Sequence, residues 1–204
     1  MKGGRFLTVR QPWASLIMAG GKDVENRPKA VPSTLPQWYR CLECGMRTAP
    51  GVNLSDSMCE PDAVQDGPFP FRLWVHAGKD WDDTGNHAAF VAVVEDRLSD
   101  AAALPRGVLL GYVTVTGCHH AERCKHGKYP GRWTVGDALD EAAGGASPSY
   151  CSPWAQPDAF HWTLADPVPL PEPIRLKGAL GLPFMPDDVL AAALSQLEGV
   201  TAHG

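Results

Sequence analysis

Four charged residues follow a double glycine near the start of the chain, and their types suit ligand binding or catalysis. Gly20-Gly21 precedes Lys22, Asp23, Glu25 and Arg27. If a tight turn brings Lys22 and Glu25 to the edge of a cleft, the lysine can meet phosphate or carbonyl oxygens and the carboxylate can accept N–H groups. A desolvated lysine can also act as a base, because burial lowers its pKa. The alternative is a solvated cluster of salt bridges at a helix end.

Three cysteines in the following segment have a spacing that suits zinc. Cys41 and Cys44 form a Cys-x-x-Cys pair, with Cys59 downstream. In a reducing compartment this pattern favours a metal site over a disulfide, so we expect a structural zinc held by these residues. A fourth ligand would come from a distant histidine or cysteine, or from an aspartate such as Asp56 or Asp62. An unmetallated thiol loop and a redox pair are the alternatives.

A second group of metal-ligand types follows the middle of the chain. The spacing of Cys118, His120, Cys124 and Cys151 permits a metal site, although it matches no standard finger or ribbon pattern. No organic cofactor is indicated.

The same part of the chain carries a patch of basic and aromatic residues in an otherwise acidic sequence. Such a patch fits single-stranded nucleic acid through backbone charge and base stacking. An ordinary solvated loop is the alternative, and it is the favoured one. Its members are Arg123, Lys125, Lys128, Tyr129, Arg132 and Trp133.

The elements that must position these groups are readable from periodicity. Residues 6–10 predict a strand, and Pro12 suits the first turn of a short helix that Gly20-Gly21 ends. In an extended segment 24–27, Glu25 and Arg27 share one face. Residues 71–77 alternate as a half-buried strand, after which Lys79 and His76 would lie at the rim of the same cleft; a core-edge role is the alternative for His76.

Later segments complete the predicted scaffold. Residues 108–116 give the clearest strand pattern, and 160–164 alternate in the same way. The proline-rich stretch 167–173 suits a sheet edge. Residues 83–98 and 186–197 predict amphipathic helices that serve packing.

Length, charge and hydropathy limit the classes of protein to which this chain can belong. The 204 residues are enough for a real core, and we expect a domain over 1–185, with a cysteine-containing insertion at 28–70 and a glycine-rich basic loop at 121–150, followed by a C-terminal helix and tail over 186–204. The formal charge of −5 argues against a broad basic face that coats nucleic acid. No apolar run reaches the ~20 residues of a membrane span, so a cytoplasmic protein without membrane partners is expected.

The motifs resemble those of a known family. Residues 11–16, Gln-Pro-Trp-Ala-Ser-Leu, followed by Gly21-Lys22-x-x-Glu25-x-Arg27, are similar to the opening signature of the ASCH domain, which is grouped with PUA-like folds. Residues 74–79 and 177–182 resemble its His-Ala-Gly-Lys strand and its closing glycine-rich strand. The resemblance implies an α+β fold with a partly closed β-barrel of about five or six strands and two or three flanking helices. The 28–70 insertion departs from the shorter family segment.

The resemblance also implies a function. It points to binding of RNA, single-stranded nucleic acid or a nucleoside in a cleft near the opening motif. The candidate ligand-binding residues are Gln11, Ser15, Lys22, Glu25, Arg27, His76, Lys79 and Trp154.

Two other functions stay open. Some similar proteins hydrolyse acylated cytidine nucleosides and others are described as nucleases, which would make Lys22 and Glu25 catalytic. However, the hydroxyl residue that those amidohydrolases carry three places after the lysine is Glu25 here, so water would have to be the nucleophile. The third hypothesis is a zinc-stapled protein-interaction module without a nucleotide.

Overall fold

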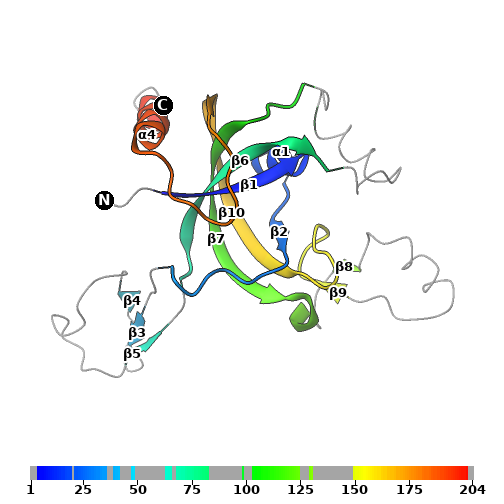
Figure 1. Ribbon diagram of the computed structural model, residues 1–204. Coiled ribbons are helices and arrows are strands. Elements are labelled where there is room, and N and C mark those ends of the chain that lie inside the picture. The colour runs from blue at the N-terminus through cyan, green and yellow to red at the C-terminus, as the bar shows by residue number, and fades with distance from the viewer. Residues whose placement is uncertain are drawn as a thin grey trace.

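The computed structural model describes residues 4–19, 21–35, 39–41, 47–48, 63–65, 68–82, 98, 103–124, 129–130 and 149–201. The centre of the fold is a five-stranded mixed sheet in the order β1-β6-β7-β10-β2 (Figure 1). Its strands are β1 (Arg5–Gln11), β2 (Val24–Arg27), β6 (Phe71–Trp81), β7 (Val108–His120) and β10 (Phe160–Arg175). The helices described with it are α1 (Trp13–Ala19), the short 3-10 helix η3 (Ala121–Cys124) and α4 (Asp187–Thr201).

Two small sheets accompany the main one. The first has the order β4-β3-β5, and the second pairs β8 with β9. Their strands are β3 (Tyr39–Cys41), β4 (Arg47–Thr48), β5 (Ala63–Gln65), β8 (Tyr129–Pro130) and β9 (Ser149–Tyr150).

The main sheet pairs β1 with β6 in parallel and its other neighbours antiparallel. The α+β class expected from the sequence is therefore confirmed. Within the described residues the sheet has two ends, β1 and β2, and does not close into a barrel. Figure 1 shows β7 and β10 as long, strongly curved neighbours that join the two halves of the sheet.

Both faces of the sheet are covered, because alternate residues of its strands point to opposite sides. Leu7 and Val75 belong to a core cluster that includes Ile17 of α1. Their sequence neighbours Phe6 and Trp74 belong instead to a cluster that receives α4. The sheet thus packs α1 on one face and α4 on the other, and the predicted 186–197 helix is confirmed as α4.

The proline-rich part of β10 is accommodated by irregular pairing. β2 pairs only with residues 160–163 of β10, so the segment expected at a sheet edge has β7 alone as its described sheet neighbour. Register shifts interrupt the β7 pairing between Ala165 and Val168 and again between Pro169 and Ile174. A proline lacks the N–H that a two-sided ladder needs, and this arrangement removes that demand.

Three sequence predictions lie outside the described residues. The predicted helix over 83–98 is described only at Leu98, and the 28–70 insertion only in short pieces. Most of the basic loop at 121–150 is likewise outside them, including Lys125, Lys128, Arg132 and Trp133.

Candidate ligand pocket and metal cluster

A pocket of about 620 Å³ opens where the charged motif meets the ends of β1 and β6. That volume is in the range of sites that bind small organic ligands. The surrounding residues come from β1, β6, α1 and β2, from the positions that follow α1, β2 and β6, and from the loops at 151–156 and 178–181. They are Thr8, Val9, Arg10, Trp13, Lys22, Glu25, Asn26, Arg27, Pro28, Gly78, Lys79, Asp80, Asp82, Trp154, Gln156, Gly178, Ala179, Leu180 and Gly181.

Lys22 reaches the pocket because helix α1 stops just before it. The backbone N–H of Lys22 donates to Leu16 O at 3.1 Å, and Gly21 has φ +70°, a conformation that glycine adopts without strain. The lysine side chain is only 3% exposed, and its Nζ donates to the Val24 carbonyl. The turn at Gly21 therefore buries the Lys22 side chain beside β2.

Glu25 is the partner of that cation. Its Oε2 lies 3.2 Å from Lys22 Nζ, and its Oε1 lies 3.7 Å from an Arg27 guanidinium nitrogen. The Glu25 side chain is 9% exposed, whereas that of Arg27 is 30% exposed. The pocket thus contains a Lys–Glu ion pair that is almost completely buried from solvent, with a more exposed arginine beside it.

Two tryptophans line the pocket next to this ion pair. The rings of Trp13 and Trp154 meet edge to face, with centroids 6.4 Å apart. Trp13 Nε1 donates to Asp82 at 2.9 Å, and Trp154 Nε1 donates to Gly21 O at 3.1 Å. Hydrogen bonds at both indoles fix the rings in place, which suits aromatic walls that contact a ligand.

Another part of the lining is the loop at 178–181, and a buried histidine helps to hold the chain there in place. Ala179 N–H donates to Thr8 Oγ1 at 3.2 Å, and His76 Nδ1 lies 3.2 Å from the same hydroxyl. His76 Nε2 lies 2.9 Å from Leu176 O, so a neutral ring with its proton on Nε2 satisfies every contact. Burial lowers the pKa of His76 below its ordinary value, in agreement with a neutral ring.

The predicted site residues divide into two groups. Lys22, Glu25, Arg27, Lys79 and Trp154 all line the pocket, with Lys79 exposed at its rim.

The remaining three are buried outside the described lining. Gln11 is fully buried, donates through Nε2 to Ser15 Oγ at 2.9 Å and to Pro105 O at 2.7 Å, and accepts from Ser15 N–H. His76 is 1% exposed and anchors the loop described above. The hydrogen bonds of Gln11 and His76 are thus made inside the protein.

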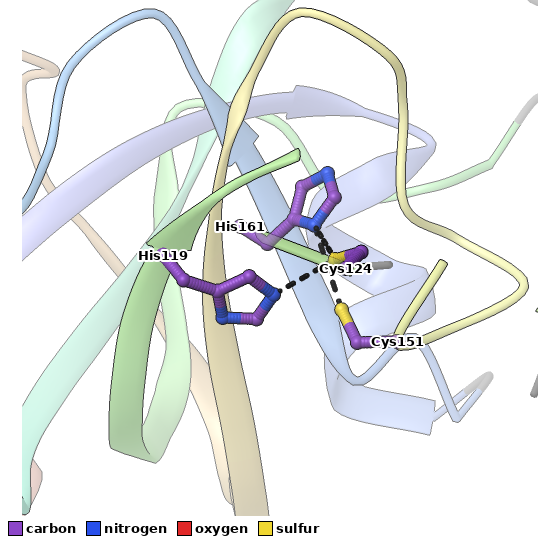
Figure 2. A group of neighbouring side chains, drawn as sticks. All are labelled: His119, Cys124, Cys151 and His161. Carbon is purple, nitrogen blue, oxygen red and sulfur yellow. Dashed lines mark hydrogen bonds between the residues drawn. The ribbon is translucent and has the colours of Figure 1, made fainter. Parts of the chain in front are cut away.

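A second group of reactive side chains lies beside the loop that carries Trp154. His119, Cys124, Cys151 and His161 each offer one ligand atom, and the four atoms lie within 4.8 Å of one another. Figure 2 shows the four side chains pointing toward one another. His119 Nε2 is 3.0 Å from Cys124 Sγ, and His161 Nδ1 is 3.2 Å from Cys124 Sγ and 3.5 Å from Cys151 Sγ. This group can hold a metal ion.

Strand register brings the two histidines together. His119 at the end of β7 is the direct partner of His161 on β10, and cross-strand partners share one face of a sheet. The η3 turn then returns Cys124 to the same face, and Cys151 follows β9.

The cluster differs from the set that sequence spacing indicated. Cys124 and Cys151 belong to it, but Cys118 and His120 do not, because alternation along β7 turns them away from His119. His120 instead lies 3.5 Å from Glu122. The zinc site predicted at Cys41, Cys44 and Cys59 falls outside the residues whose side chains are described.

Burial favours the neutral form of three side chains of the cluster, His119, Cys151 and His161. Desolvation, and then the neighbouring Cys124, raise the pKa of the Cys151 thiol to about 12. Burial also lowers the pKa of His119, with Arg123 adding to the effect, and of His161. Neutral imidazoles are the form that binds metal, whereas the thiols must lose their protons when a cation enters.

Comparison of the chain with protein-family models and with curated proteins gives no match. Among the described residues, no helix is both long and apolar enough to cross a membrane.

Proposed function

We propose that the pocket binds a nucleobase of RNA or single-stranded nucleic acid, or the corresponding nucleoside. The observation that carries this proposal is the convergence of Lys22, Glu25 and Arg27 with Trp13 and Trp154 on one pocket. Aromatic faces suit the stacking of an unpaired base, and a carboxylate suits its N–H groups. Exposed cations suit phosphate.

The charge distribution fits a local contact with nucleic acid. Arg10, Arg27 and Lys79 supply positive charge around a pocket that also contains Asp80 and Asp82. With a formal chain charge of −5, phosphate binding would depend on these few cations and not on a broad basic face. We therefore expect recognition of one or two nucleotides, with moderate salt dependence.

The resemblance to the ASCH domain is part of the same proposal. The motif residues Gln11 to Leu16 span the end of β1 and the start of α1, and the His-Ala-Gly-Lys stretch lies in β6. The curved neighbours β7 and β10 would form the remaining wall of a PUA-like, partly closed barrel. What supports this assignment is that the separate motifs border one pocket.

Binding is testable with labelled oligonucleotides and a matched pair of charge variants. Lys79→Ala removes a rim cation, whereas Arg175→Ala removes an exposed cation that does not line the pocket. We expect fluorescence anisotropy to show weaker binding of short single-stranded RNA or DNA for Lys79→Ala only, and free nucleoside to compete. Equal losses in both variants would indicate nonspecific attraction and contradict the proposal.

A hydrolytic role for the same pocket is the second candidate, favoured by the 3.2 Å contact between Lys22 and Glu25. Glu25 would orient or deprotonate a water while Lys22 stabilised the developing charge. Incubation with acylated cytidine and with RNA, read by mass spectrometry, separates the two functions. Product formation that Glu25→Gln abolishes would establish an enzyme, and binding without product would establish a reader.

A further inference from the structure

The cluster of His119, Cys124, Cys151 and His161 contains two sulfur and two nitrogen donors, all within 4.8 Å of one another. We propose that these four residues form a structural zinc site that fixes one wall of the pocket. The site is independent of what the pocket binds.

The donor spacing fits tetrahedral zinc. Zn–S bonds of about 2.3 Å and Zn–N bonds of about 2.0–2.1 Å place neighbouring S and N ligands about 3.6 Å apart in a tetrahedron. The S···N distances from Cys124 to the two histidines are 3.0 and 3.2 Å, and that from Cys151 to His161 is 3.5 Å. These three distances lie close to the tetrahedral value, and the remaining donor pairs lie within 4.8 Å, so side-chain rotations that draw the four donors together would complete the geometry.

The donor types select the metal and the role. Thiolate and imidazole together favour zinc over magnesium or calcium, which prefer oxygen ligands. Four protein ligands leave no open position for a substrate or water, and this is the pattern of a structural site. Binding of Zn²⁺ by two thiols and two neutral imidazoles releases two protons to solvent and leaves a site with no net charge.

A second hydrogen bond orients one ligand for this task. His161 Nε2 lies 2.8 Å from Gln156 O and donates to it, so Nδ1 carries a lone pair that faces the two sulfurs. His161 itself is fully buried. A backbone carbonyl that fixes the tautomer of a ligating histidine is a common companion of zinc sites.

The cluster is placed to stabilise the pocket wall. Residues 151–156 begin at the ligand Cys151 and end at the Gln156 carbonyl that holds His161. Between them, Trp154 O accepts from Asn26 Nδ2 at 2.8 Å, and Gln156 N–H donates to Asn26 Oδ1 at 3.0 Å. A metal at the cluster would tie β7, η3 and β10 to the same loop that presents Trp154.

The test uses the full chain with Cys41, Cys44 and Cys59 changed to serine, so that a second site cannot supply the metal. Zinc content is measured by mass spectrometry, and cobalt is substituted for spectroscopy. We expect one zinc per chain, tetrahedral d–d bands and a charge-transfer band with the intensity of two thiolates. Absence of zinc and cobalt binding would overturn the proposal, as would a Cys124–Cys151 disulfide in protein purified without reductant.

Matched variants assign the ligands. Cys151→Ser and His161→Gln should lose the metal, whereas Cys118→Ser and His120→Gln should keep it, because these neighbours lie outside the cluster. Retention of stoichiometric zinc by Cys151→Ser would overturn the assignment. If the ligand variants fail to fold, the cobalt spectrum of the parent decides: two thiolates support the site, and none or one contradicts it.

Discussion

The Lys22–Glu25 pair offers a direct way to separate structural from functional roles in the pocket. Both side chains are nearly buried, at 3% and 9% exposure, and Nζ lies 3.2 Å from Oε2. Lys22→Met leaves the carboxylate with only the more distant Arg27 at 3.7 Å, among the contacts described. Removing one partner of a buried pair costs roughly 3–5 kcal/mol, and we expect about 3 kcal/mol here because Arg27 compensates in part.

Glu25→Gln and the double variant Lys22→Met/Glu25→Gln complete a double-mutant cycle, and their stabilities follow from the same contacts. Glu25→Gln keeps an oxygen that accepts from Lys22, so its cost should be about 1.5 kcal/mol. The double variant removes both charges together, and we expect it to cost about 2 kcal/mol, less than the sum of the single changes by a coupling of about 2.5 kcal/mol. With a urea m-value of about 2 kcal/mol/M, Lys22→Met alone should lower the unfolding midpoint by roughly 1.5 M.

Urea unfolding and ligand binding are then measured on all four proteins. The decisive protein is the double variant, which should be almost as stable as Glu25→Gln and yet bind no nucleotide. Additive destabilisation would refute the buried pair, because non-interacting charges show no coupling. Full affinity in the double variant would refute the role of the pair in recognition.

Three further predictions test the pocket walls. A Cβ at Gly178 would lie 2.9 Å from His76 Cε1, so Gly178→Ala should destabilise the fold by about 1–3 kcal/mol through overpacking and should weaken ligand binding. The control is Gly199→Ala in α4, where a Cβ meets open space, and urea unfolding should show it to be neutral or stabilising. Burial lowers the pKa of His76 in the folded state below its ordinary value of 6.5. The contribution of His76 to folding stability is therefore complete above pH 6.5 and is lost as the pH falls toward the lowered pKa. His76→Gln should flatten this dependence of the unfolding midpoint on pH. An unchanged slope would contradict the buried neutral ring. Chelation of the zinc proposed at the His119–Cys124–Cys151–His161 cluster should weaken ligand binding severalfold, and added zinc should restore it. Trp154→Leu should remove most of that sensitivity, as measured by anisotropy titrations.

The strands that border the pocket were predictable because their signals are local. Period-two alternation located β6 and β7, and the apolar run before Gln11 located β1. The parallel pairing of β1 with β6 had no comparable signal, since it depends on contacts between residues far apart in the sequence. The open order of the sheet has the same origin.

The charged motif was predictable for a similar reason. Lys22, Glu25 and Arg27 lie within six consecutive positions, so a turn and a short strand suffice to bring them together. Gln11, Ser15 and His76 also have side chains suited to ligands, but their hydrogen bonds are satisfied inside the protein. Residue type alone does not distinguish a polar group that faces a pocket from one that supports it.

The cysteine–histidine cluster shows that sequence spacing alone does not predict which residues come together as ligands. Cys118 and His120 flank His119 and lie six and four residues before Cys124, yet of these three only His119 contributes to the cluster with Cys124. The deciding quantity is the register of β7 against β10, which places His161 opposite His119. The alternation of side chains along β7 identifies His119 as a ligand only when its pairing with β10 is known. Sequence spacing between possible ligands does not contain that pairing.

The loops at 151–156 and 178–181, which both line the pocket, are each held in place by hydrogen bonds to polar side chains. Thr8, His76 and Leu176 hold the loop at 178–181, while the cluster and Asn26 hold the loop at 151–156. A ligand that enters a preformed pocket loses less free energy to loop ordering than one that must organise its own site. Loosening either anchor should therefore lower affinity without removing a single ligand contact, and loosening both should lower it further, because the two loops share no anchoring residue in the contacts described. Nonadditive losses would instead show that the loops order each other.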